Sequence, residues 1–395
     1  MTEAALQTKI DNADSNTSMS ELLNMLHSAK EYSYHSLYDS AGLLPAADSA
    51  NIGRLAFAEA NDGMYVFVGM DSGWQLVDSD AETIVSSGPS SHIQGSLAGY
   101  SLAGRAGPSY TNVIQKYSYS SDGNATDVAD ATAAFSQHIT TYSATDAFTH
   151  GGYGPSAERA NVDKFNFSSG TDATDFGDHP GTGRYGGATS SPTHGYIHGG
   201  NAAASSYGAP GQQHITKFPH SAGTLSTTLV SGTGLSAVSR YNQTNASETH
   251  GYVSSLGPSD NKIEKYSFST DGATTDVGDL LNSTDDGRGT HSGLMSDVAG
   301  GYGYVNSGYL DTTYDISRYP FASDGNAADV GDRHTDVWLG SVSASTTSGY
   351  MAGGLTPPPA AYINNIQKFT FASSSNATDV GDLLAANGYN GGAAN

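Results

Sequence analysis

One motif occurs six times along this chain and constrains its fold more than any other feature. Each copy has an alternating segment of the type Ile-x-Lys-Phe-x-Phe, a short turn such as Ser-Asp-Gly-Asn, and a segment of the type Ala-Thr-Asp-Val-Gly-Asp. The basic residues of successive copies lie 48 to 53 positions apart, a period typical of β-propeller blades. These residues are Lys116, Lys164, Lys217, Lys265, Arg318 and Lys368.

Local patterns predict four strands in each copy. The alternating segment fits a strand with one buried face, and the turn, in which Asp122, Asp271 and Asp324 lie, should return the chain as an antiparallel strand. A glycine- and tyrosine-rich segment precedes each alternating segment, and we expect its glycines to allow close backbone approach at the crowded propeller centre. Segments between copies, such as the one from Arg184, supply the fourth strand.

The two ends of the repeat region complement each other. After Asp382 the chain resembles only a fourth strand, whereas Ser90–Gly104 is a glycine- and tyrosine-rich segment with no copy before it. The sequence therefore predicts an all-β fold, a six-bladed propeller over residues 85–395, closed by pairing of this N-terminal strand with the C-terminal tail.

Residues 1–84 lack the repeat. A capping-box spacing and a stripe of leucines predict a helix at about 18–32, and short strands joined by Asn-Asp-Gly and Asp-Ser-Gly turns predict a β-meander at about 52–78. Since a single amphipathic helix is marginal in isolation, we expect this module to anchor the chain and to form a homo-oligomer. The apolar stripe comprises Leu22, Leu23, Leu26 and Ala29.

Composition excludes several classes of function. With 16 basic and 39 acidic residues the formal charge is -23, which opposes nucleic-acid binding. The absence of cysteine excludes thiolate metal sites, a cysteine nucleophile and the crosslinked tyrosine of galactose-oxidase-like enzymes. Because there is neither an 18-residue apolar run nor a signal-peptide pattern, we expect a soluble protein without membrane insertion.

Acidic residues in the repeat suggest structure rather than catalysis. The turn at Asp122 departs from the Asp-box of sialidases, because Gly123 follows the aspartate directly and no tryptophan follows the threonine. A pair of aspartates recurs in five copies, whereas an active site is normally single, so we expect ion pairs with the repeated lysines or with Arg184, Arg240 and Arg288. The pairs are Asp127 and Asp130, Asp175 and Asp178, Asp276 and Asp279, Asp329 and Asp332, and Asp379 and Asp382.

Histidines offer a second possible chemistry. His150, His194 and His250 each follow a threonine and are taken as equivalent positions of three blades. Equivalent positions in a six-fold ring are too far apart to share a metal, so a hydrogen-bonding role is expected. Calcium at the loop around Asp285 stays open, although this loop lacks the glutamate of an EF-hand. The sequence otherwise predicts no cofactor and no enzyme.

The repeats resemble known families. Their Gly-rich strand followed by an aromatic strand is similar in architecture to kelch-like propellers. Units such as Lys-Phe-x-Phe-Ala-Ser-Asp-Gly-Asn-Ala-Thr-Asp-Val-Gly-Asp and Thr-His-Gly-Tyr-x-x-Gly-Gly resemble repeat proteins of tailed bacteriophages of marine cyanobacteria, and the stretch from Gly53 to Val77 resembles a hairpin module of phage fibre and virion proteins. The resemblance implies a virion structural protein, such as a tail fibre, spike or capsid appendage, that contacts other virion proteins through residues 1–84.

Connections between the glycine- and tyrosine-rich segments and the alternating segments differ most between copies. They are rich in Tyr, Ser, Gly, Pro and Asn, a composition typical of adaptable recognition surfaces. We therefore expect host recognition through a surface glycan or protein; the alternatives are a purely structural capsid or tail component and, more weakly, a glycan-cleaving propeller enzyme. The candidate contact residues are Tyr110, Arg159, Tyr207, Tyr309, Tyr314 and Tyr362.

Overall fold

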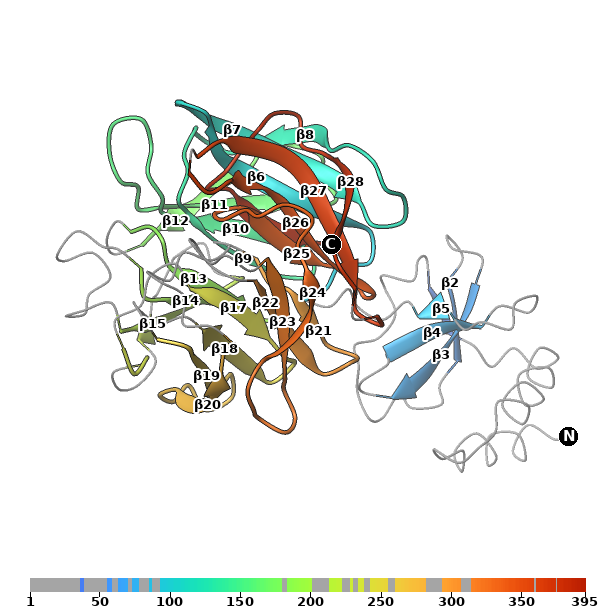
Figure 1. The fold of residues 1–395 in the computed structure, drawn as a ribbon. Coiled ribbons are helices and arrows are strands. Elements are labelled where there is room, and N and C mark those ends of the chain that lie inside the picture. The colour runs from blue at the N-terminus through green and yellow to red at the C-terminus, as the bar shows by residue number, and fades with distance from the viewer. Residues whose placement is uncertain are drawn as a thin grey trace, which may run out of the picture. The chain divides into compact units, whose positions relative to one another are not determined.

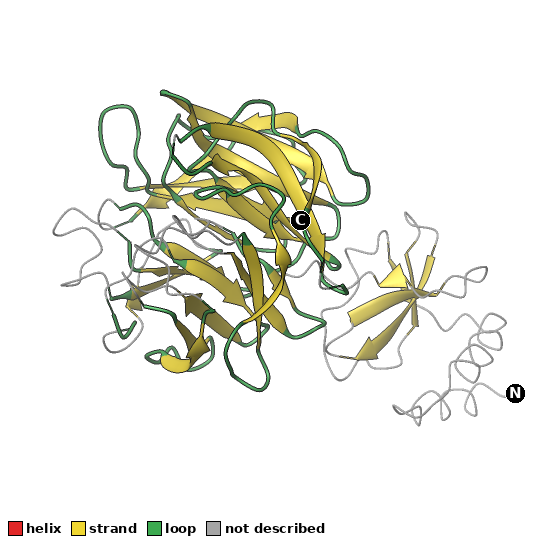
Figure 2. Cartoon of the chain, in the orientation of Figure 1, coloured by secondary structure: helices red, strands yellow, loops and turns green. Residues whose placement is uncertain are grey.

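The computed structural model divides the chain into two compact units, Met1–Ser90 and Ser91–Asn395. In the first unit it describes five strands between residues 36 and 86. In the second it describes residues 93–179, 183–200, 213–221, 228–229, 234–237, 242–254, 260–281, 293–306, 314–358, 360–373 and 375–395. Every regular element of these residues is a strand (Figure 2).

The first unit contains one five-stranded sheet in the order β1-β2-β3-β4-β5. Its first two strands are parallel, and each later pair is antiparallel. The helix predicted at about 18–32 lies outside the described residues. The strands are β1 (Ser36–Tyr38), β2 (Leu55–Ala58), β3 (Gly63–Gly69), β4 (Gly73–Val77) and β5 (Val85–Ser86).

The second unit is a six-bladed β-propeller, in which each blade is a four-stranded antiparallel sheet (Figure 1). From its inner to its outer strand, the first blade contains β29 (Gly391–Ala394), β6 (Ala98–Ala106), β7 (Ser109–Ser118) and β8 (Thr126–Asp130). The second blade contains β9 (Ile139–Tyr142), β10 (Asp146–His150), β11 (Asn161–Asn166) and β12 (Thr174–Asp178), and the third contains β13 (Gly187–Ser190), β14 (His194–His198), β15 (Ile215–Pro219) and β16 (Thr228–Leu229).

The remaining three blades have the same strand order. The fourth contains β17 (Gln243–Ala246), β18 (His250–Ser254), β19 (Lys262–Ser267) and β20 (Thr275–Asp279). The fifth contains β21 (Ser296–Asp297), β22 (Tyr302–Asn306), β23 (Asp315–Pro320) and β24 (Ala328–Asp332), and the sixth contains β25 (Ser341–Ala344), β26 (Ser348–Leu355), β27 (Tyr362–Thr370) and β28 (Thr378–Asp382). Only the first blade combines strands from both ends of the unit, with Gly391 opposite Leu102 and Ala394 opposite Gly99.

The innermost strands correct one prediction. The centre of the ring is formed by the short segments between copies, such as β13, and not by the glycine- and tyrosine-rich strands, which lie second in each blade. The glycines of those second strands serve a different purpose. A Cβ on Gly251 would lie 2.5 Å from the Tyr266 ring, and one on Gly195 would lie 2.1 Å from the Phe218 ring. Glycine is needed because an aromatic ring of the neighbouring strand lies directly on the backbone.

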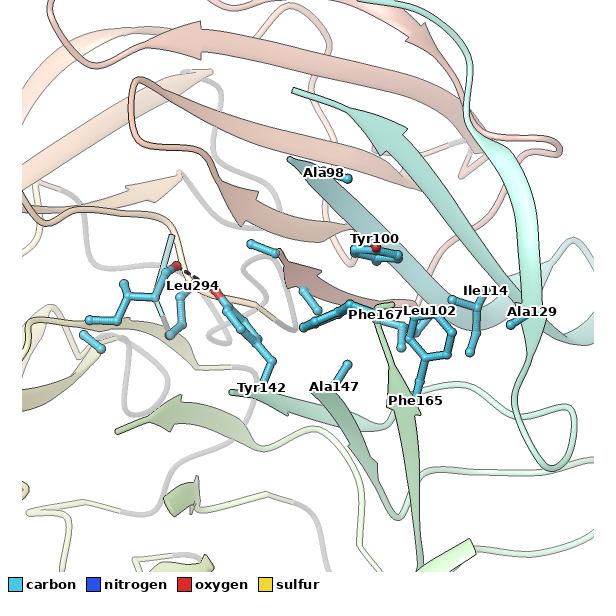
Figure 3. Packing of buried hydrophobic residues seen from close by; sticks show 14 residues of the cluster. Ala98, Tyr100, Leu102, Ile114, Ala129, Tyr142, Ala147, Phe165, Phe167 and Leu294 are labelled. Atoms are coloured by element: carbon cyan, nitrogen blue, oxygen red, sulfur yellow. Dashed lines mark hydrogen bonds between the residues drawn. The ribbon is translucent and has the colours of Figure 1, made fainter. Parts of the chain in front are cut away.

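Aromatic side chains join each blade to the next. In the first blade Tyr100 packs against Phe165 and Phe167 of the second, with ring centroids 5.7 and 4.9 Å apart (Figure 3). Such ring pairs contribute about 0.5–1.5 kcal/mol each beyond their burial. The Phe-x-Phe pattern of the repeat is therefore the contact between blades. The equivalent groups are Phe148 with Phe218 and His220, Tyr196 with Tyr266 and Phe268, Tyr252 with Tyr319 and Phe321, Tyr304 with Phe369 and Phe371, and Tyr350 with Tyr117 and Tyr119.

Three of the five repeated lysines, Lys217, Lys265 and Lys368, pair with turn aspartates of the next blade, which corrects the predicted pairing with the strand carboxylates. Lys164 lies 3.3 Å from Asp146 of its own blade. Lys217 Nζ lies 2.7 Å from Asp271, and Lys265 Nζ lies 2.6 Å from Asp324. Both aspartates have a positive φ, 50° and 47°, as a tight turn requires.

In four of the five pairs, the first aspartate bonds its own backbone instead. Asp379 Oδ1, for example, accepts a hydrogen bond from the Gly381 amide at 3.2 Å. Of the arginines proposed as partners, Arg184 pairs with Glu158 at 3.2 Å, while Arg240 and Arg288 lie outside the described residues.

Candidate functional site

Two sets of connections meet at one end of the propeller. Because the four strands of a blade alternate in direction, the loops from second to third strand lie at the same end as the loops leading into the next blade. We call this end the loop face. Its described parts include residues 105–110, 131–138, 151–160, 183–186, 333–340, 356–358, 360–361 and 384–390.

A chain of backbone hydrogen bonds runs through the loop face around the inner strands. The Tyr389 amide donates to the Leu339 carbonyl at 2.7 Å, the Gln137 amide to the Tyr389 carbonyl at 3.0 Å, and the Tyr185 amide to the Gln137 carbonyl at 3.2 Å. Leu339 precedes the inner strand of the sixth blade, Tyr389 that of the first, Gln137 that of the second and Tyr185 that of the third. Each has a φ between 55° and 62°. Such left-handed conformations in bulky residues cost about 1–3 kcal/mol each and concentrate at functional sites.

Around this chain, five aromatic side chains and two arginines form a continuous series of ring contacts, and a sixth aromatic residue, Tyr362, lies close enough to Arg105 to be affected by its charge. The Tyr389 ring lies 6.5 Å from both Trp338 and Tyr185, measured between ring centroids. The Tyr153 ring lies 6.3 Å from that of Tyr110. We call the series the aromatic belt: Trp338, Tyr389, Tyr185, Arg184, Tyr153, Tyr110, Arg105 and Tyr362.

Arg184 joins the two halves of the belt. Its guanidinium lies 4.9 Å from the Tyr153 ring centroid and 5.1 Å from that of Tyr185. It also bonds Gln137 Oε1 at 2.9 Å and Glu158 at 3.2 Å. The guanidinium is therefore held by a hydrogen bond, an ion pair and two aromatic rings.

Exposure distinguishes the belt from the aromatic core. All eight belt side chains are half-buried, whereas the tyrosines between blades, such as Tyr100 and Tyr196, are about 1% exposed. The belt therefore presents aromatic surface to solvent while its backbone is held by the propeller. Rigid tyrosine and tryptophan surfaces of this kind supply binding area at low cost in conformational entropy.

Two of the predicted contact residues meet in the belt. Tyr110 and Tyr362 both lie beside Arg105, which stacks on Tyr110 with 5.5 Å between guanidinium carbon and ring centroid. Burial raises the pKa of Tyr362, while the nearby Arg105 charge acts in the opposite direction. The structure thus brings together residues 252 positions apart, which the sequence could place only on separate loops.

The other predicted contact residues have different surroundings. The guanidinium carbon of Arg159 lies 4.0 Å from the Phe135 ring centroid, and its Nη2 lies 3.4 Å from Asp163, so its charge is paired within the chain. Tyr314 is 48% exposed, and none of the ring contacts found in the described residues joins it to the belt. Tyr207 and Tyr309 lie outside the described residues.

Sequence reasoning missed most of the belt. Tyr185 and Tyr389 both stand two residues before an innermost strand, and the similarity of Arg-Tyr-Gly-Gly to Gly-Tyr-Asn-Gly-Gly was the available signal. Tyr153, Trp338 and Arg105 have no counterpart in the repeat.

The histidine alignment was wrong. Phe148 stands opposite Lys164 and Tyr196 opposite Lys217, so the last residue of β10, His150, corresponds to His198 and not to His194. His150 is fully buried, with its Nδ1 2.9 Å from His179 Nε2. Burial holds the pKa of both well below the usual value, to about 4 for His179.

His194 and His250 begin their strands and are half-buried. Each bonds the preceding threonine hydroxyl at 2.8 Å. Among the described residues, no group of three or more His, Asp or Glu side chains is arranged to hold a metal ion. The loop at Asp285 lies outside those residues.

No protein-family model and no curated protein matches this chain. Nor does the described part contain a helix long and apolar enough to cross a membrane.

Proposed function

We propose that this chain is a non-enzymatic recognition protein of a virion whose propeller binds a host-surface glycan through the aromatic belt. The observation that carries the proposal is the belt itself, in which six half-buried aromatic rings lie over four adjacent blades beside a backbone hydrogen-bond chain. Sugar rings have apolar C–H faces that stack on aromatic rings, and their hydroxyls bond polar groups at the rim of such a site.

The two tyrosines at the centre of the belt support a binding role. All four residues of the hydrogen-bond chain are left-handed, a conformation that glycine would adopt without penalty. Leu339 and Gln137 are buried, whereas Tyr389 and Tyr185 are half-buried and add rings that reach solvent. Retention of two tyrosines is consistent with a use for their rings at the surface.

The virion setting rests on the resemblance of the repeats and of the segment Gly53–Val77 to phage structural proteins. In this proposal residues 1–84 attach a homo-oligomer to other virion proteins, and the propeller is a tail-fibre, spike or appendage domain displayed outward. In this proposal the pairing of β29 with β6 also closes the ring and supplies the rigidity that display requires. The strand carboxylates that bond their own backbone favour binding over hydrolysis, because they act in the fold.

The test is polysaccharide binding by the whole chain. Host-surface polysaccharides are immobilised, and binding is compared for the native protein, Tyr153→Ala, Tyr389→Ala and the control Tyr314→Ala, an exposed tyrosine outside the belt. Each belt substitution should weaken binding about tenfold, equivalent to about 1.4 kcal/mol, and the control should not.

Other outcomes identify the alternatives. Equal binding by all four proteins contradicts the belt as the site. Absence of glycan binding together with tight binding to purified virion proteins favours a purely structural component. Shortening of the polysaccharide, abolished by replacing a single carboxylate, favours a glycan-cleaving enzyme.

A further inference from the structure

Arg105 carries a charge that no described carboxylate neutralises. Its guanidinium stacks on Tyr110, and no Asp or Glu oxygen of the described residues lies within ion-pair distance. Its Nε is buried and has no hydrogen-bond partner among the described residues. An arginine whose N–H donors are partly desolvated and unpaired gains free energy when an acceptor from outside the chain binds to it.

The other described arginines of the loop face differ in having a carboxylate partner, as Arg333 has in Asp336. Arg184 is paired with Glu158, and Arg159 is paired with Asp163. Arg105 therefore gives this part of the surface an unneutralised positive charge, although the chain as a whole has a formal charge of -23. Distant acidic groups are screened beyond about 8–10 Å at physiological ionic strength, so an anion at Arg105 responds mainly to this guanidinium.

The backbone holds Arg105 firmly in place. Its amide donates to the Gly388 carbonyl at 2.8 Å and its carbonyl accepts from the Gly388 amide at 3.0 Å, next to the strained Tyr389. It also stands opposite Tyr110 in the β6–β7 hairpin. A guanidinium that stacks on an aromatic face keeps its edge free for two parallel hydrogen bonds, the geometry that a carboxylate accepts.

From these observations, and resting on the proposed glycan-binding function, we infer that the ligand is an acidic glycan whose sugar carboxylate binds Arg105 between Tyr110 and Tyr362. The carboxylate accepts hydrogen bonds from the guanidinium, and the sugar ring stacks on the adjoining tyrosines. Neutral sugars continue along the belt toward Tyr153 and Arg184.

The experiment compares polymers that differ only in charge. Binding of the whole chain is measured for polygalacturonate, alginate and hyaluronan, each against its fully methyl-esterified form. The variants are Arg105→Met, Arg105→Lys and the control Lys116→Met, since Lys116 also lies over a tyrosine, Tyr100 at 5.8 Å, but outside the belt. Thermal melts verify that each variant folds.

The expected result is at least a tenfold preference for the carboxylate form in one pair of polymers. Arg105→Met should remove the preference, Arg105→Lys should restore part of it, and Lys116→Met should retain it. Because the contact is an ion pair, the preference should also diminish with added salt.

Two results would overturn the inference, and they separate it from the proposed function. If acid and ester bind equally and both lose affinity in Tyr153→Ala and Tyr389→Ala, the belt binds glycans but Arg105 does not select acidic ones. If none of the six polymers binds, the inference fails and the proposed function loses its support as well. A carboxylate preference that persists in Arg105→Met places the anion site elsewhere and also contradicts the inference.

Discussion

Lys368 on the last blade donates a hydrogen bond to Asp122 in the hairpin turn of the first blade, with 2.9 Å between Nζ and Oδ1 and 246 positions of sequence between the residues. The same contact joins Lys217 to Asp271 and Lys265 to Asp324. The repeated lysine and the turn aspartate therefore form an ion pair that links neighbouring blades. The ion pair occurs where the next blade has aspartate at that turn position. The second blade has Gly170 there, so Lys116 keeps only the contact over a tyrosine, Tyr100, that Lys368 also makes over Tyr350.

Replacing Lys368 with methionine should have a small effect. The lysine side chain is 25% and the aspartate side chain 54% exposed, so water screens the pair and its contribution is about 0.2–1 kcal/mol. Urea unfolding at low and high salt measures it, and the difference from the native protein should shrink with salt. Lys116→Met, which lacks a turn aspartate opposite, should show no such salt dependence.

Removing Gly391–Asn395 should destabilise the propeller strongly. The deletion takes the inner strand from the first blade, exposes the inner edge of β6 and unpairs the backbone groups that Asn395 shares with Leu97 and Ala98. We expect a loss of at least about 3 kcal/mol, or roughly 6–12 °C in Tm. Gly392→Pro, which interrupts the same pairing without truncation, should act in the same direction; unchanged melts for both proteins would contradict ring closure by this strand.

A methyl group added at Gly251 should not be tolerated. The new Cβ would lie 2.5 Å from the Tyr266 ring, which is buried between two blades, so Gly251→Ala should cost about 1–3 kcal/mol. Gly272→Ala is the matched control, because its nearest neighbour is Thr270 at 3.8 Å, and it should change stability by less than about 0.5 kcal/mol. Equal effects in denaturant unfolding would contradict this packing.

Acid should destabilise the propeller through buried histidines. Burial lowers the pKa of His138 to about 3, below its unfolded value of about 6.5. A lowered histidine pKa means that the unfolded chain binds more protons, so the contribution is complete above about pH 6.5 and is lost progressively as pH falls toward the folded pKa.

His138→Leu tests this dependence. At pH 5 the histidine should account for a loss of about 2 kcal/mol relative to pH 7, and the substitution should reduce the measured loss by that amount. His334→Leu, at an exposed position, is the control. An identical decrease between pH 7 and pH 5 in the native protein and in His138→Leu would show that the buried ring does not contribute.

Two substitutions at Tyr389 should separate backbone strain from loss of the ring. Both Tyr389→Ala and Tyr389→Gly remove the aromatic contacts, but only glycine adopts a φ of 55° without penalty. Tyr389→Gly should therefore be more stable than Tyr389→Ala by about 1 kcal/mol in chemical unfolding, while both bind glycan equally weakly. An alanine variant as stable as the glycine variant would show that no strain is stored there.

Much of the architecture follows from the sequence, because the same pattern of alternating segment, turn and returning segment occurs six times. Alternation in segments such as that around Lys265 identified the third strands, and the Asp-Gly turns identified the hairpins that follow. The position of each strand within the blade could not be obtained in this way. A glycine in the sequence indicates that another group packs closely against the backbone, but it does not identify that group. At Gly251 the group is the ring of Tyr266.

The belt was only partly predictable, for a related reason. Tyr110 and Tyr362 could be chosen because variable loops carry recognition, but their meeting at Arg105 depends on the first and sixth blades being adjacent. The error at His150 arose because its Thr-His pair was matched to the Thr-His pairs of other blades by residue type alone. The pairing of Phe148 with Lys164 shows that His150 lies at the opposite end of its strand from His194 in the next blade. Ring neighbours and strand register are long-range properties that a local pattern does not contain.

The pairing of β29 with β6 also means that the first blade cannot form until the C-terminal strand has been synthesised. Leu102 and its neighbours in β6 leave the ribosome nearly three hundred residues before their partners at Gly391–Ala394. During that interval the inner edge of β6 is an unpaired strand, open to association with other nascent chains. Chains that terminate before Gly391–Ala394 keep this edge unpaired and cannot complete the first blade, so we expect chaperones and proteases to act on them.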